Sequence, residues 1–185
     1  VPTFAKNNDK PLIYVSFGSP YNSCFDPETD DVLWERSDFV CNHFRGAGSS
    51  PVIYNNILIL HFDGSDEQYV VALDKQTGET IWRTDRSVEF DDIDEETGKP
   101  ERDGDWRKAF STPTIAQVDG RDVLISLGSM ALYAYDPNTG KELWRVEFIG
   151  SHSGACRPVF EHGLIYAPTG AGAELWVIRP DGSGV

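Results

Sequence analysis

One segment of the sequence occurs twice, and this repeat restricts the folds that the chain can adopt. Residues 69–84 read YVVALDKQTGETIWRT, and residues 131–146, 62 positions later, read ALYAYDPNTGKELWRV. In each copy apolar residues alternate, a turn ends in Thr-Gly, and a second short segment carries tryptophan. The copies share Ala72/Ala134, Asp74/Asp136, Thr77/Thr139, Gly78/Gly140, Trp82/Trp144 and Arg83/Arg145. The pattern predicts a β-hairpin, and its recurrence predicts a repeat architecture.

Two weaker copies flank the strong ones. Residues 25–35 keep Asp26, Thr29 and Trp34 in register, but Asp30 replaces the glycine, and residues 176–184 hold a truncated copy. In the strong copies the glycine suits a position with positive φ, and the aspartate can accept hydrogen bonds from backbone amides within the turn.

Two further strands are predicted before each hairpin, which gives units of four short strands. Pro51, Pro113 and Pro158 each lie just inside the first strand of a unit, and the units recur every 43 to 62 residues. This arrangement is typical of blades, so we predict an all-β fold, a β-propeller of four-stranded antiparallel blades. Residues 1–185 form one domain with a partial blade at 10–36, blades at 43–84 and 106–147, and a partial blade at 151–185. We expect the chain to begin within a repeat, since nothing upstream supplies a first strand, and we expect no helix.

An acidic insertion at 85–105 interrupts the repeat. Between residues 89 and 105 there are nine acids and two bases. We expect a surface loop, where insertions are tolerated. Asp92, Asp94, Glu96 and Asp103 match positions 1, 3, 5 and 12 of a calcium-binding loop, but Thr97 stands where glycine is required. A solvated run of charge is therefore favoured over a metal site.

Composition excludes some classes of partner. The net charge of −14, from 16 basic and 30 acidic residues, argues against nucleic acid and anionic lipid. No apolar run approaches the ~20 residues that a transmembrane helix requires. Cys24, Cys41 and Cys156 allow at most one disulfide and do not identify the compartment.

The pattern A-x-D-x-x-T-G-x-x-x-W resembles the tryptophan-docking motif of the quinoprotein-type (PQQ-like) β-propellers. The resemblance implies that Trp82 and Trp144, and in part Trp34, pack between neighbouring blades, with the alanine of the motif making room. Such propellers usually have seven or eight blades. The resemblance therefore implies about three and a half blades of a larger propeller, whose remaining blades are needed as partners, and an extracytoplasmic (periplasmic or secreted) location. A closed four-bladed ring is the alternative.

The same family contains quinone-dependent alcohol and sugar dehydrogenases and a non-catalytic scaffold lipoprotein of outer-membrane assembly. The dehydrogenases typically show an adjacent Cys-Cys pair and a calcium ion held by Glu, Asn and Asp. This sequence has no Cys-Cys pair. We therefore expect a non-catalytic binding or scaffold module with no cofactor; the alternative is part of a PQQ- and calcium-dependent dehydrogenase.

Three residues are candidates for binding a ligand. Arg45, Arg107 and His152 each stand four positions before the aligned Ser49, Ser111 and Cys156. The first strand of a blade is innermost, so these side chains would form an arc at the mouth of the central channel. Such an arc suits a protein or small anionic ligand with a carboxylate or phosphate. We expect at least one arginine to lack a carboxylate partner; alternatively, both pair with acids of neighbouring blades.

Overall fold

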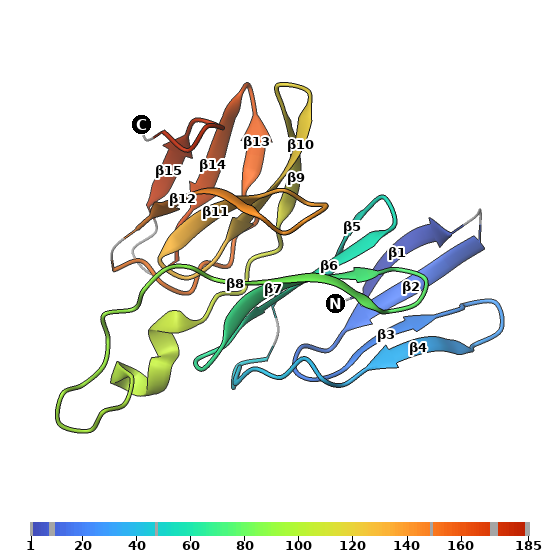
Figure 1. Ribbon diagram of the computed structural model, residues 1–185, viewed down its shortest axis with the longest axis horizontal. Helices are drawn as coiled ribbons and strands as arrows, with labels where there is room; N and C mark the ends of the chain where they lie inside the picture. The colour runs from blue at the N-terminus through green and yellow to red at the C-terminus, as the bar shows by residue number, and fades with distance from the viewer. Residues whose placement is uncertain (1, 8–9, 47, 149, 171–173, 184–185) are drawn as a thin grey trace.

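A computed structural model describes the chain apart from residues 1, 8–9, 47, 149, 171–173 and 184–185. Four antiparallel sheets follow one another, and neighbouring strands in each sheet are consecutive in sequence (Figure 1). Within the described residues, the first three sheets have four strands and the last has three. Successive up-and-down sheets of this kind are propeller blades. The predicted fold class, a partial β-propeller, is confirmed.

The blades are named here in chain order. Blade 1 contains β1 (Pro2–Asn7), β2 (Lys10–Ser16), β3 (Asn22–Phe25) and β4 (Val32–Arg36). Blade 2 contains β5 (Val52–Tyr54), β6 (Ile57–Asp63), β7 (Gln68–Asp74) and β8 (Thr80–Asp85). Blade 3 contains β9 (Thr114–Val118), β10 (Arg121–Leu127), β11 (Ala131–Tyr135) and β12 (Glu142–Glu147). Blade 4 contains β13 (Val159–Glu161), β14 (Leu164–Pro168) and β15 (Leu175–Ile178).

Two expectations about secondary structure are wrong. Blade 1 has its first strand, because β1 pairs with β2 from Pro2 opposite Val15 to Asn7 opposite Lys10. The segment PTFAKN has little apolar alternation, so its sequence does not indicate a strand. The connection between β8 and β9 also contains a short 3-10 helix, η1 (Glu101–Arg107). Polar residues and a positive-φ segment at 102–104 hid this helix from a search for apolar periodicity.

The apolar core is divided into layers between adjacent blades. Because side chains alternate along a strand, a sheet between two others is apolar on both faces. All seven residues of β6 are buried, which explains why it reads ILILHFD instead of alternating with polar residues. One face of β6 and β7 packs against blade 1 and the other against blade 3.

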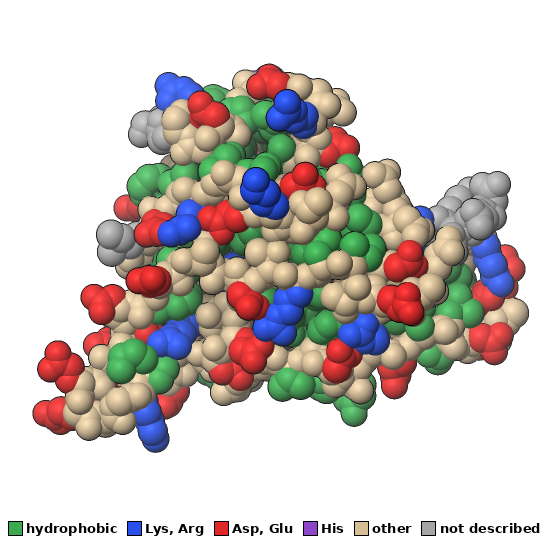
Figure 2. Space-filling view, viewed as in Figure 1, with side chains coloured by type: hydrophobic (Ala, Val, Ile, Leu, Met, Phe, Trp, Pro, Cys, Tyr) green, Lys and Arg blue, Asp and Glu red, His purple; other side chains and the backbone are tan. Residues whose placement is uncertain are grey.

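The first strands of the blades face one side of the molecule. In Figure 1 the first strands lie toward the upper right of their sheets; they are β1, β5, β9 and β13. The last strands of the first three blades, β4, β8 and β12, lie on the opposite side of their sheets. The connection 86–113 projects away from the sheets at the lower left. Figure 2 shows acidic side chains gathered over this projection.

Candidate functional site

Each tryptophan on an outer strand reaches into the next blade. The Nε1–H of Trp34 donates to the carbonyl of Lys75 at 3.1 Å, that of Trp82 to Pro137 at 3.2 Å, and that of Trp144 to Pro180 at 3.0 Å. Trp34 and Trp82 are buried, and Trp144 is half-buried. The indole thus buries an apolar ring while its one polar group is bonded.

The glycine of each receiving turn makes room for the indole. Gly78 and Gly140 have φ values of 73° and 70°. A Cβ on Gly78 would lie 2.7 Å from the Trp34 ring, and one on Gly140 would clash with Trp82 in the same way. Ala72 and Ala134 are fully buried and lie opposite their own blade's tryptophan in the strand register. Small residues therefore occur where the ring needs space.

The aspartate and threonine of the motif hold the turn in shape. Asp74 Oδ1 accepts hydrogen bonds from the amides of Gln76 and Thr77, and Asp136 repeats the pattern with residues 138 and 139. Thr77 and Thr139 accept from the amides two residues later. In blade 1, Asp30 has the same positive φ, 61°, but carries a side chain.

The two candidate arginines of the arc both have carboxylate partners. Arg107 donates from Nε and Nη2 to Asp92, and both side chains are largely buried. Arg45 lies 3.5 Å from Asp105, with 58% of its side chain exposed. The expectation that one arginine is unpaired is wrong, because the acidic insertion folds back over the loops that precede the first strands.

The loops that carry the arc do lie side by side. The Nε2 atom of His43 is 3.2 Å from the carbonyl oxygen of Ala109, and the amide of Phe110 donates to the carbonyl of Gly154 at 2.9 Å. His152 stacks on Trp106 with ring centroids 5.4 Å apart, and its Nδ1 is 2.8 Å from Ser153 Oγ. The ligand-binding role of Arg45, Arg107 and His152 stays a prediction.

The candidate calcium residues serve the fold of the insertion. Asp92 binds Arg107. Asp94 accepts hydrogen bonds from the amides of Glu96 and Thr97 and from the Thr97 hydroxyl. The bonds from Thr97 lower the pKa of Asp94. In the part of the chain that the structure describes, no three metal-ligating side chains, Asp103 included, gather into a site.

A buried ion pair within blade 2, whose arginine also contacts blade 3, was not predicted. Arg86 donates from Nε and Nη2 to the two oxygens of Asp63 at 2.9 and 3.0 Å, and each side chain is only 2% exposed. Its Nη1 donates to Ser126 at 2.7 Å and to Tyr135 at 3.3 Å. Burial acts to lower the pKa of Arg86, but the Asp63 carboxylate together with Tyr135 and Tyr133 outweighs burial, and the pKa rises. Neither Arg86 nor Asp63 belongs to the repeated motif, so the alignment of the repeats did not identify them as a pair.

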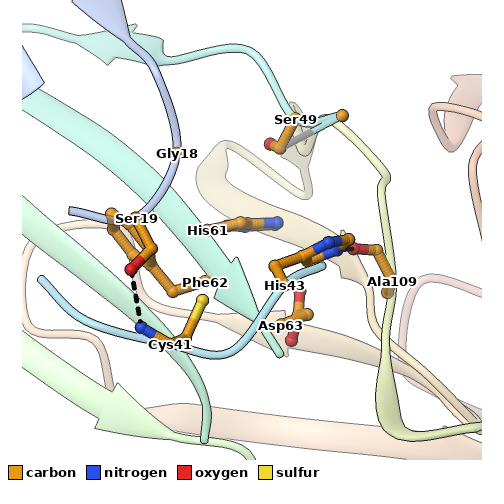
Figure 3. Close-up of a pocket in the computed structure, with 10 residues that line it drawn as sticks. Gly18, Ser19, Cys41, His43, Ser49, His61, Phe62, Asp63 and Ala109 are labelled. Carbon is orange, nitrogen blue, oxygen red and sulfur yellow. Dashed lines mark hydrogen bonds between the residues drawn. The ribbon is translucent and has the colours of Figure 1, made fainter. Parts of the chain in front are cut away.

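A small cavity lies between the loops of blades 1 and 2 (Figure 3). Its lining includes Ser19, Cys41, His43 and His61, and its volume of about 10 Å³ is enough for one water molecule. Burial, together with Arg86, lowers the pKa of His61 well below its usual value. Burial also raises the pKa of the Cys41 thiol to about 12, which disfavours the reactive thiolate. The cavity therefore belongs to the core and is too small for an organic substrate.

The repeated sheets and the indole contacts agree with a family match. Residues 66–183, more than half of the chain, match the PQQ-type repeat family described as outer membrane protein assembly factor BamB. The chain belongs to this family. No curated protein sequence matches it significantly.

Solved structures share the fold at low identity. BamB from Moraxella catarrhalis superposes with a TM-score of 0.63 at 15% identity, covering 98% of this chain and 50% of BamB. Quinohemoprotein alcohol dehydrogenase from Comamonas testosteroni gives 0.61 at 16% identity, covering 96% and 33%. The C-terminal domain of PilY1 from Pseudomonas aeruginosa gives 0.57 at 17% identity, covering 91% and 38%. This chain thus spans half or less of each of these chains, and the likeness establishes the fold alone.

Among the described residues, no helix has the length and apolar character needed to cross a bilayer.

Proposed function

We propose that this chain is a non-catalytic binding or scaffold part of a larger PQQ-like propeller protein. One observation carries the proposal: two carboxylates of the candidate calcium loop are already engaged by the fold. Asp92 is bound by Arg107, and Asp94 is bonded within its own turn. A carboxylate that holds an arginine in a largely buried pair is a poor metal ligand, because binding the metal would leave the arginine uncompensated.

The family supports the same proposal. Its description names an assembly factor, and BamB of Moraxella catarrhalis covers nearly all of this chain. We place the protein outside the cytoplasm, in the periplasm or in association with the outer membrane. The remaining blades of the same propeller and a protein or small anionic ligand are its proposed partners.

A second function is favoured by one specific finding. The fold of a quinohemoprotein alcohol dehydrogenase also covers 96% of this chain. Under this alternative the chain is part of the catalytic domain of a dehydrogenase that uses PQQ and calcium, with the ligands supplied mainly by blades outside this sequence.

Reconstitution separates the two functions. The whole propeller protein, with the blades outside this sequence, is incubated with PQQ and calcium, and alcohol oxidation is followed with an artificial electron acceptor while the melting temperature is recorded. A genuine quinoprotein dehydrogenase is the positive control, and calcium alone is the negative control. We expect no oxidation and no change in melting temperature. Calcium-dependent oxidation, or an increase of several degrees with PQQ, would contradict the non-catalytic proposal.

A further inference from the structure

The first strands of the blades border an open groove of about 500 Å³. Phe4 of β1 lies at one side, Ser50 precedes β5, Thr112 precedes β9, and Arg157 precedes β13. Residues from four successive blades thus meet on the side of the molecule toward which the first strands face (Figure 1). This groove is separate from the arc of Arg45, Arg107 and His152, none of which lines it.

Arg157 is held in the groove without neutralisation of its charge. Its Nε donates to Thr114 Oγ1 at 2.8 Å, and that hydroxyl donates to the carbonyl of Pro158 at 2.6 Å. Among the described residues, no carboxylate lies within ion-pair distance of Arg157. Six other arginines of the described chain do have such partners: Arg36, Arg45, Arg83, Arg86, Arg107 and Arg145. The bond through Nε orients the guanidinium and leaves its terminal nitrogens available.

One hydroxyl of the groove can also donate, whereas the Thr3 hydroxyl already donates to the carbonyl of Pro51 at 2.8 Å. Thr112 Oγ1 accepts a hydrogen bond from the Ser50 amide at 2.9 Å, so its own proton can be donated to a ligand. Of the residues that the structure describes, no acidic one lines the groove, although the chain has 30 acids and a net charge of −14. The side chain of Phe4, 71% exposed, supplies an apolar wall. The groove therefore combines one positive charge, one hydroxyl donor and an apolar surface.

We infer that this groove binds a carboxylate whose neighbouring group is apolar. The inference rests on the proposed function, since it names the ligand chemistry of the binding module. The terminal nitrogens of Arg157 receive the two carboxylate oxygens, because a guanidinium matches a carboxylate in this geometry. Thr112 donates to one of these oxygens, and the apolar group lies against Phe4. A free small acid and an acidic side chain of a peptide offer the same chemistry.

Titration of the full chain with matched probes tests this inference. Phenylacetate represents a free acid, and the capped dipeptide acetyl-Phe-Glu-amide represents an acidic side chain. Phenylacetamide and acetyl-Phe-Gln-amide have the same shape without the charge. Binding is measured by amide chemical shifts in NMR spectra at low salt, because salt screens exposed charges. We expect saturable binding of at least one acid, with the largest shifts at Thr112 and Arg157.

Two arginine variants locate the site. Arg157→Gln should weaken binding of the acid about tenfold or more, the loss expected for a hydrogen bond to a charged group. Arg121→Gln is the matched control, since Arg121 is also exposed and lies outside the groove. It should bind as the parent does, and both variants should melt at the parent's temperature. Binding of phenylacetate alone would indicate a small-molecule ligand, and binding of the dipeptide would indicate a protein partner.

Three outcomes would overturn the inference: no saturable binding of either acid, equal binding of the amides, or unchanged binding by Arg157→Gln. These outcomes leave the proposed function standing, because the reconstitution with PQQ and calcium tests it separately. Conversely, PQQ-dependent oxidation would overturn the non-catalytic proposal whatever Arg157 binds.

Discussion

The indole nitrogen of Trp82 lies 3.2 Å from the carbonyl oxygen of Pro137, and the ring fills the space beside Gly140, where a side chain would otherwise stand. One residue of blade 2 is therefore fitted to one turn of blade 3. The hydrogen bond and the close ring contact require the two blades to keep a fixed relative position.

Gly140→Ala should destabilise the chain more than Gly163→Ala does. Both glycines have positive φ, 70° and 75°, so both substitutions introduce backbone strain of about 1–2 kcal/mol. A Cβ at Gly163 meets nothing within 4 Å, whereas one at Gly140 meets the Trp82 ring. The ring clash should add about 1–3 kcal/mol. Urea unfolding measures the free energy of unfolding of both variants. Equal decreases in the two variants would show that the Trp82 ring moves aside freely.

Trp82→Ala should lower the free energy of unfolding by about 3–5 kcal/mol, as expected for removing a buried aromatic side chain. Trp176→Ala provides a comparison, because Trp176 is only partly buried and its Nε1 donates to Glu174 of the segment before its own strand. Trp176→Ala should therefore lower the free energy of unfolding by less than Trp82→Ala does. A Trp82 variant that melts within a degree or two of the parent would disprove the role of the indole in joining the blades.

Arg86→Met should cost about 3–5 kcal/mol, because Asp63 would be left buried without its positive partner. Arg83→Met is the control, since Arg83 pairs with Glu67 and Asp85 at a surface where such pairs contribute about 0–1 kcal/mol. The double variant Asp63→Leu with Arg86→Met should recover part of the loss. If the double variant is less stable than Arg86→Met, the unpaired charge is not the cause.

His61 should make stability depend on pH. Its pKa is lowered in the folded state by burial and by Arg86, and Ser126 Oγ lies 3.2 Å from its Nε2. Below the unfolded value of about 6.5, the unfolded chain takes up a proton that folded His61 refuses, so stability falls by up to about 1.4 kcal/mol per pH unit. Denaturant titrations between pH 7 and pH 5 measure this slope.

A matched pair of variants isolates the contribution of His61. His61→Gln should reduce the slope, while His162→Gln should leave it unchanged, because the side chain of His162 is 83% exposed. An identical slope in parent and His61→Gln would assign the pH dependence to other groups.

Calcium at millimolar concentration should not change the melting temperature. The tip of the insertion, residues 94–99, is closed by the amide of Asp94, which donates to Lys99 at 2.9 Å, and it carries none of the contacts between blades. Replacing this tip with two glycines should therefore also leave melting nearly unchanged. An increase of several degrees with calcium in the parent, absent from the shortened variant, would establish a metal site there.

Repetition made some features of this fold predictable and left others invisible. Trp82 and Gly140 recur at fixed spacing, so the sequence identifies them before their contact is known. Strand β1 has no repeated signature, and only its pairing with β2 reveals it. Register correctly placed neighbouring loops side by side, but it could not show that Asp92 reaches Arg107, since the insertion occurs once. Arg157 was overlooked for a different reason: its free charge depends on which acids lie near it in space, and the order of residues along the chain does not show this.

The two sides of the contact between Trp82 and Pro137 are also synthesised at different times. The two residues are 55 positions apart, so on the ribosome the indole is made well before the turn that receives it. At roughly 5–20 residues per second, that interval lasts about 3 to 11 seconds. During that time blade 2 has a large aromatic ring with no partner on its outer strand. Nascent blades are thus vulnerable to aggregation on one particular face, and synthesis of the following blade removes the hazard.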